Sequence, residues 1–115
     1  MGVHVLIVDD SKTVRDRLAE ALGELPNVSS VRAADDLAAA RRALADSTPD
    51  LIVLDLHLPD GLGLELLPAV SHVAMLSANA SVEHAQLARR AGARWFFEKP
   101  EGLPALIELV RGWPH

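Results

Sequence analysis

Apolar residues follow two alternating patterns along this chain, one typical of buried strands and the other of helices that cover them. Short apolar runs such as Val3–Val8 are nearly continuous, as in strands buried on both faces of a parallel sheet. Between these runs, apolar residues return every three or four positions, which indicates amphipathic helices. The predicted strands are Val3–Val8, Val28–Ala33, Leu51–Leu54, Val73–Leu76 and Arg94–Phe97.

Local signals mark where the helices begin and end. Ser11 and Ser81 can accept a hydrogen bond from a free N–H of the first helical turn, and so can either Asp35 or Asp36. The predicted helices are Lys12–Gly23, one from Asp35 or Asp36 to about Asp46, Leu62–Val70, one from Ser81 to Gly92, and one from about Leu103 to Arg111. Strands that alternate with helices predict one α/β domain over residues 1–115, with right-handed crossovers.

Composition narrows the possible classes of protein. The chain has 115 residues, half of them apolar, which suits one folded domain with a sizeable core. It has no cysteine, so disulfides and thiolate metal sites are excluded. No apolar run approaches the roughly 20 residues of a membrane-spanning helix, and no basic leader precedes the first strand. The formal charge of −5 argues against broad binding to nucleic acid. We therefore expect a cytoplasmic domain without direct membrane or nucleic-acid contact.

Polar side chains follow four of the predicted strands. Asp9 and Asp10 follow the first strand, Asp55 the third, Ser77 the fourth and Lys99 the fifth. The carboxyl ends of parallel strands lie along one edge of a sheet, so these groups should lie together there. Carboxylate oxygens are ligands that Mg²⁺ prefers, and an ammonium group can bind phosphate oxygens. The pattern predicts a magnesium and phosphoryl site.

Each of these residues also has a simpler interpretation when it is taken alone. Asp9 and Asp10 could serve merely to stabilise the start of the first helix. Asp55 could begin the turn that leads to Pro59–Gly61. Lys99 could be an exposed residue in a strand-to-helix turn. Their occurrence at the ends of successive strands favours a shared site over these separate interpretations.

Five short segments, in order, resemble the receiver domain of two-component response regulators over the whole chain. They are VDDS at 8–11, VLDLHLPDG at 53–61, LSA at 76–78, AGA at 91–93 and FFEKP at 96–100. The resemblance implies a flavodoxin-like, doubly wound five-stranded parallel sheet with strand order 2-1-3-4-5. It also implies that the chain acts in phosphorelay signal transduction and is itself phosphorylated.

The resemblance assigns a role to each polar residue of the edge. Asp55 would be the phosphoacceptor and form 4-aspartylphosphate. Asp9, Asp10, Asp55 and the backbone carbonyl of His57 would bind Mg²⁺ as the cofactor. Lys99 would bind the phosphoryl group.

Further residues are assigned by the same resemblance to the switch and to the lifetime of the phosphoryl group. Ser77 would hydrogen-bond a phosphoryl oxygen, and Phe96 would turn inward when Ser77 moves. The side chains of His57 and Asn79 would tune dephosphorylation.

The implied partners are a sensor histidine kinase or a histidine phosphotransfer protein and an unknown output protein or domain, with a second copy of the chain as a further candidate. Phosphorylation would change the face formed by the fourth helix, fifth strand and fifth helix. The domain would not be an enzyme beyond its own phosphoryl transfer and hydrolysis. The alternative is a degenerate receiver that acts as a phosphorylation-independent protein-binding module.

Two regions depart from the family pattern. Only 21 residues separate Asp55 from Ser77, and Gly61, Gly63 and Pro68 disfavour helix there, so we expect a shortened third helix.

The second departure is Trp95, which stands where a smaller residue is usual. It could widen the output face or pack on the domain's own core. The histidines other than His57 are interpreted as structural or surface residues. His4 lies at the opposite end of the first strand from the site, and the solvated ones are His72, His84 and His115.

Overall fold

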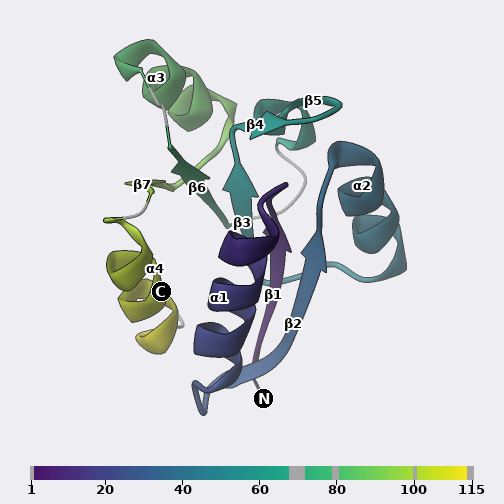
Figure 1. The fold of residues 1–115 in the computed structure, drawn as a ribbon, viewed down its shortest axis with the longest axis vertical. Coiled ribbons are helices and arrows are strands. Elements are labelled where there is room, and N and C mark those ends of the chain that lie inside the picture. The colour runs from purple at the N-terminus through teal and green to yellow at the C-terminus, as the bar shows by residue number, and fades with distance from the viewer. Residues whose placement is uncertain (1, 68–71, 79–80, 100, 114–115) are drawn as a thin grey trace.

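The computed structural model describes residues 2–67, 72–78, 81–99 and 101–113, and a parallel sheet forms its centre (Figure 1). The strands of this sheet are β1 (Val3–Val8), β2 (Val28–Ala34), β3 (Leu51–Asp55), β6 (Val73–Ser77) and β7 (Trp95–Glu98). Their order is β2-β1-β3-β6-β7, and every neighbouring pair is parallel. The predicted fold class and strand order are confirmed.

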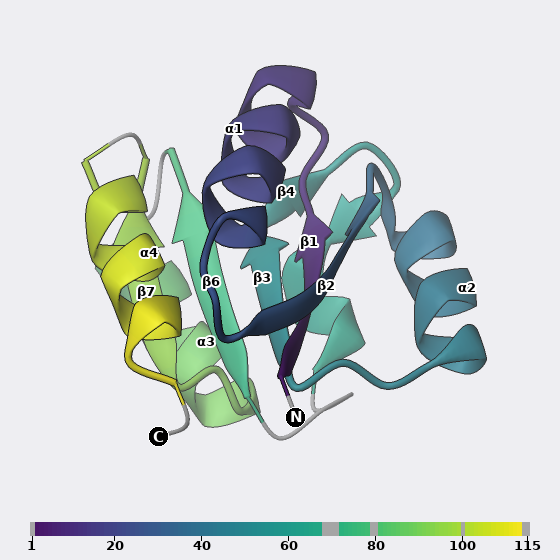
Figure 2. The same ribbon diagram turned by 90° about the horizontal axis from the view of Figure 1, so that it is seen from below.

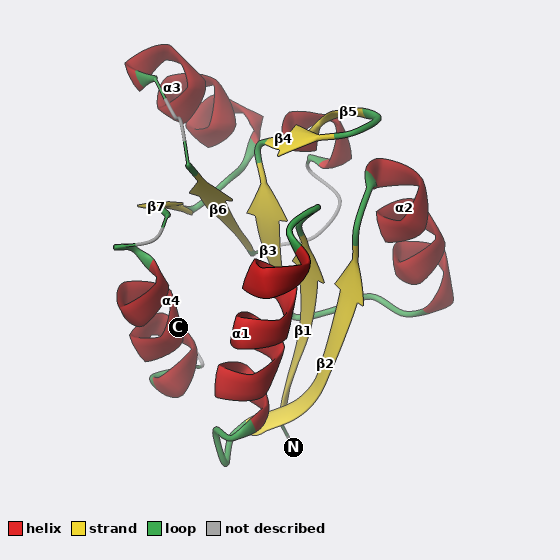
Figure 3. Cartoon of the chain, viewed as in Figure 1, coloured by secondary structure: helices red, strands yellow, loops and turns green. Residues whose placement is uncertain are grey.

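Helices cover both faces of the sheet (Figures 2 and 3). They are α1 (Lys12–Gly23), α2 (Leu37–Asp46), α3 (Val82–Ala91) and α4 (Leu103–Arg111). Apolar residues of α1 and α4 pack into one core cluster, and those of α2 and α3 pack into another on the opposite face. Among the described residues, no helix is both long and apolar enough to cross a membrane.

The alternation of side chains along each strand explains the continuous apolar runs. In β1, Leu6 and Val8 belong to the cluster under α2 and α3, which we call the α2–α3 core. Val5 and Ile7 belong to the cluster under α1 and α4, the α1–α4 core. All four side chains are fully buried, which stabilises the fold by about 1.5–3 kcal/mol for each large aliphatic residue.

The helix ends follow the predicted signals. Side-chain oxygens of Ser11, Asp36 and Ser81 accept hydrogen bonds from the N–H three residues further on, at 3.3, 2.7 and 3.1 Å. Gly92 ends α3 with a φ of 118°, a conformation that favours glycine. Of the two candidate caps for the second helix, the structure has Asp36.

The segment after β3 differs from the predicted helix Leu62–Val70. The chain forms a small antiparallel hairpin of β4 (His57–Leu58) and β5 (Gly61–Leu62), followed by a short 3-10 helix, η1 (Gly63–Leu66). The remainder of the predicted helix, residues 68–70, lies outside the described residues. The expected shortening is therefore present, but the described part is a hairpin and one tight turn rather than an α-helix.

Two glycines explain this conformation. Gly61 has a φ of 150°, which disfavours residues with a side chain. Gly63 lies so close to the carbonyl of Asp55 that a Cβ atom there would clash with it. The Gly63 N–H donates to the Leu56 carbonyl at 2.7 Å, so the hairpin folds back under the end of β3.

Asp60, in the turn of this hairpin, ties it to the start of α2. Its carboxylate accepts hydrogen bonds from the backbone N–H groups of Leu37 at 2.8 Å and Ala38 at 3.1 Å. These donors, Leu37 first, lower the pKa of Asp60. The ionised carboxylate therefore stabilises the folded protein.

The first prediction is that Asp60→Asn destabilises the protein at neutral pH. Because the pKa of Asp60 is lower in the folded state, its contribution is present above the unfolded value of 3.8 and is lost as the pH falls through the folded value. Denaturant unfolding should show a lower free energy of unfolding for the variant than for the wild type. This difference should shrink on acidification. Asp35→Asn, which removes the same charge beside the same helix, is the control. A difference that is constant with pH, or equal in the control, would contradict the prediction.

Candidate functional site

Four strand ends bring the predicted polar residues to one edge of the sheet. Asp9 follows β1, Asp55 ends β3, Ser77 ends β6 and Lys99 follows β7. Among the described residues, the buried polar or charged ones are Asp9, Asp55 and Ser77, which are 1%, 6% and 1% exposed. Polar groups are rarely buried without a use or a partner, which marks this edge as the candidate site.

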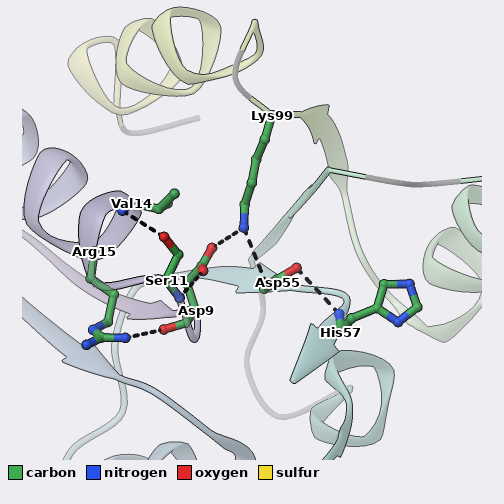
Figure 4. Close-up of polar contacts among 7 residues, drawn as sticks. All are labelled: Asp9, Ser11, Val14, Arg15, Asp55, His57 and Lys99. Atoms are coloured by element: carbon green, nitrogen blue, oxygen red, sulfur yellow. Dashed lines mark hydrogen bonds and ion pairs between the residues drawn. The ribbon is translucent and has the colours of Figure 1, made fainter. Parts of the chain in front are cut away.

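Lys99 connects the two buried carboxylates (Figure 4). Its Nζ lies 2.6 Å from Oδ2 of Asp9 and 3.3 Å from Oδ2 of Asp55. The backbone N–H of Lys99 donates to the carbonyl of Ser77 at 2.9 Å, which fixes where its side chain starts. The lysine is therefore a partly buried counter-ion and not an exposed turn residue.

Asp9 is held in place by its main chain as well as its side chain. Its Oδ1 accepts the Ser11 N–H at 2.9 Å, and its carbonyl accepts a hydrogen bond from Nη1 of Arg15 at 2.8 Å. Its N–H donates to the Ala34 carbonyl of β2 at 3.0 Å. Sequence reasoning did not single out Arg15, because an arginine in the first turns of an amphipathic helix carries no distinctive signal.

The two ionisable groups at the centre of the site have shifted pKa values. Burial, and next the negative charge of Asp9, raise the pKa of Asp55, although Lys99 opposes them. Burial acts against the charge on Lys99, but hydrogen bonding and attraction to Asp9, together with attraction to Asp55, prevail and raise the pKa of Lys99. The ammonium therefore stays charged beside carboxylates that repel each other.

The acids at this edge could hold a divalent cation. Asp9, Asp10 and Asp55 each offer a carboxylate oxygen, and these oxygens lie within 4.8 Å of one another. Asp10 is exposed, so one side of the group is open to solvent. The three carboxylates and the Lys99 ammonium leave a formal charge of −2, which a divalent cation would neutralise.

Ser77 offers a second sign that the site is built for a ligand. Its Oγ is buried and has no hydrogen-bond partner within the described part of the chain. A buried hydroxyl left without a partner costs free energy of about 1–3 kcal/mol. A phosphoryl oxygen bound at the site would satisfy it.

The two residues predicted to flank the site are His57 and Asn79. The His57 N–H donates to Oδ1 of Asp55 at 3.4 Å, but its imidazole extends to the side of Asp55 that faces away from Lys99. There it meets the ring of His84, which was interpreted as solvated and is instead half-buried. Asn79 lies outside the described residues. The tuning roles of His57 and Asn79 stay predictions.

The aromatic residues of β7 face opposite sides of the sheet. Phe96 packs against the α2–α3 core, whereas Trp95 and Phe97 pack against the α1–α4 core. The Trp95 ring lies 5.8 Å from that of Trp113, and the guanidinium of Arg94 lies over it at 5.0 Å. Trp95 therefore packs on the domain's own core, which was one of the two alternatives left open.

Comparisons with known proteins agree on one family. The family model of the response regulator receiver domain matches residues 5–111. The chain is 35% identical to the sensory transduction protein LytT of Enterococcus faecalis, over 85% of this chain and 42% of LytT. It is 39% identical to the response regulator protein PilR of Pseudomonas aeruginosa, over 91% of this chain and 24% of PilR. The chain thus spans less than half the length of these relatives.

A solved structure shows the same fold. A CheY-like response regulator receiver domain protein from Methanospirillum hungatei superposes with a TM-score of 0.86 at 26% identity. The match covers 96% of this chain and 92% of that one. The resemblance predicted from the sequence is confirmed at the level of family and fold.

The second prediction concerns stability without a metal. Because the pKa of Asp55 is raised in the folded state, its ionised carboxylate destabilises the metal-free fold at neutral pH. Asp55→Asn should therefore raise the unfolding temperature, with a gain that disappears as the pH falls below the unfolded value of 3.8. With Mg²⁺ the wild type should become the more stable of the two proteins. At ten times its Kd, a ligand that binds only the wild type raises the free energy of unfolding of that protein by about 1.4 kcal/mol.

Two further variants control this experiment. Asp10→Asn should lose the stabilisation by Mg²⁺ while keeping its metal-free stability. Asp35→Asn, an exposed acid after β2 at the same sheet edge, should keep the stabilisation. Equal stabilisation of all variants by Mg²⁺ would show that these acids are not the metal site.

Proposed function

The chain belongs to the response regulator receiver domain family, and from this premise we propose that it is a phosphorylation-dependent signalling switch. Asp55 accepts a phosphoryl group from a sensor histidine kinase or a histidine phosphotransfer protein. Mg²⁺ at Asp9, Asp10, Asp55 and the carbonyl of His57 is its cofactor. The observation that carries the proposal is the placement of Lys99, whose Nζ contacts both Asp9 and Asp55.

In the transfer step, a carboxylate oxygen of Asp55 attacks the phosphorus atom of a phosphohistidine. The new O–P bond forms as the P–N bond breaks, and the electron pair of that bond stays on the donor's imidazole. Lys99 is close enough to Asp55 to contact an oxygen of the incoming group and to offset its negative charge. Water later attacks the same phosphorus and returns the carboxylate and inorganic phosphate.

A bound Mg²⁺ supplies positive charge that neutralises the phosphoryl oxygens. The acids of this chain fit it, because the group has excess negative charge, an exposed member and only oxygen donors. Asp9 is fixed by Ser11 and Arg15, so it would present its carboxylate with little loss of freedom.

Ser77 and Phe96 provide a link from the site to the surface. By strand alternation Ser77 lies on the same face as Met75, and Met75 pairs in register with Phe96. A phosphoryl oxygen that draws the Ser77 hydroxyl toward Asp55 vacates space beside Phe96. This gives the modified and unmodified states different contacts, as any switch requires.

The alternative function, a protein-binding module that is never phosphorylated, needs neither a counter-ion between the acids nor a free buried hydroxyl. Both features favour the phosphorylated switch. The output protein or domain and any second copy of the chain would bind the face that changes with Phe96. A cytoplasmic location, where such kinases act, stays a prediction.

The third prediction is that Asp55 alone becomes stably phosphorylated. Acetyl phosphate with Mg²⁺ should add one phosphoryl group to the wild type, as measured by intact mass, and none to Asp55→Asn. Chelation of Mg²⁺ should prevent the modification, because the phosphoryl charge is then poorly neutralised. Asp35→Asn is the matched control and should be modified like the wild type. Modification of Asp55→Asn would place the acceptor elsewhere.

The fourth prediction tests the switch with the two phenylalanines of the chain. After fluorophenylalanine labelling, ¹⁹F NMR should show one signal each for Phe96 and Phe97, assigned with Phe97→Leu. Beryllofluoride with Mg²⁺ should shift the Phe96 signal and leave Phe97, on the opposite face, nearly unchanged. Ser77→Ala should still bind beryllofluoride but lose most of the Phe96 shift. A shift that persists without the hydroxyl would exclude this coupling.

A further inference from the structure

The side chain of His57 has a defined neighbour outside the phosphoryl site. Its backbone is tied to the carboxylate of Asp55, while its imidazole extends away from Lys99 (Figure 4). The ring of His84, in the first turn of α3, meets it edge-on with the centroids 5.5 Å apart and an interplanar angle of 79°. Rings at this distance and angle attract one another through edge-to-face packing.

His84 also carries a polar atom that lacks a partner. Its Nδ1 is buried and makes no hydrogen bond within the described residues. A neutral imidazole has one N–H donor and one acceptor nitrogen, so a neighbouring imidazole is chemically able to supply the partner that His84 lacks. His57 is exposed, and its ring is the imidazole that lies beside His84. His84 therefore offers His57 both a packing surface and an unfilled hydrogen-bonding position.

We propose that His84 is a positioning residue that holds the His57 ring against α3 and away from a phosphoryl group on Asp55. The inference rests on the proposed function, since it concerns how long that phosphoryl group survives. When His84 holds the ring, water attacks the phosphoryl group without contact from the His57 side chain. When the ring is released, it can reach the path of the attacking water.

The position of α3 would then affect the chemistry at Asp55. Ala88 of α3 and Phe96 pack in the same α2–α3 core. A partner that shifts α3 on this face would move His84, release or hold His57, and change the lifetime of the modified state. The contact gives an output partner a route to control its own signal.

The test is a double-mutant cycle on the dephosphorylation rate of the full chain after acetyl phosphate labelling. His84→Ala frees the ring to reach the path of the attacking water, whereas His57→Ala removes a ring that was already held away from it. The first variant should therefore change the rate more than the second. The His84→Ala effect should be at least about threefold, roughly 0.7 kcal/mol on the barrier, and should vanish when His57 is also alanine. His84→Asn keeps a hydrogen-bonding group near Nδ1 and should restore the wild-type rate.

Two controls separate positioning from general damage to α3. Gln86→Ala, at an exposed position of the same helix, should leave the rate unchanged. In the unmodified protein, nuclear Overhauser contacts should join the two rings, and His84→Ala should shift the His57 ring signals.

Each outcome decides the matter. A His84→Ala effect that persists without His57, or a rate equal to that of the wild type, overturns this inference and leaves the proposed function intact. Absence of labelling in the wild type overturns both. A larger effect of His84→Ala than of His57→Ala, loss of the His84→Ala effect in the double variant and rescue by asparagine establish the positioning role.

Discussion

The repulsion between two buried carboxylates is the constraint around which this site is arranged. Asp9 and Asp55 lie at neighbouring strand ends, where burial strengthens their repulsion and raises the pKa of Asp55. Lys99 offsets part of this charge from a third strand end, and its own charge is stabilised in return. Because one ammonium cannot balance three acids, the metal-free protein keeps an unfavourable excess of negative charge. That excess would favour the binding of a divalent cation at this edge.

The rest of the fold holds these charges together. The strands that end in the acids are buried on both faces, and their apolar packing stabilises a register that places the carboxylates side by side. Local contacts then fix each acid: Arg15 binds the Asp9 carbonyl, and Gly63 packs against the Asp55 carbonyl. A larger residue at Gly63 would push the hairpin away from Asp55. The glycine that weakens the third helix thus also completes the site.

Local signals in the sequence were sufficient for most of the fold. Apolar runs located the strands, and Ser11, Ser81 and Gly92 marked helix ends, because these features act within a few residues. The β4–β5 hairpin was missed because its geometry depends on tertiary contacts, such as those of Asp60 with α2. The edge position of the acids followed from the topology of parallel sheets. The contact between His57 and His84 could not be predicted, since it depends on side-chain directions across two distant segments.

The residues beside Ser77 and those beside α4 pack on opposite faces of the sheet. The α2–α3 core contains Met75 of β6, Phe96 of β7 and Ala88 of α3. Strand alternation places Ser77 on the same face. Trp95 and Phe97 pack with α1 and α4 on the other face. Under the proposed switch, a change at Ser77 would reach Phe96 and α3 through the α2–α3 core that contains Met75, whereas α4 could respond only through the strands themselves. Since buried strands in register resist displacement, the α3 face should respond first, and α4 should serve mainly to hold the sheet. This argues that an output partner reads α3 and the edge at β7 before it reads the last helix.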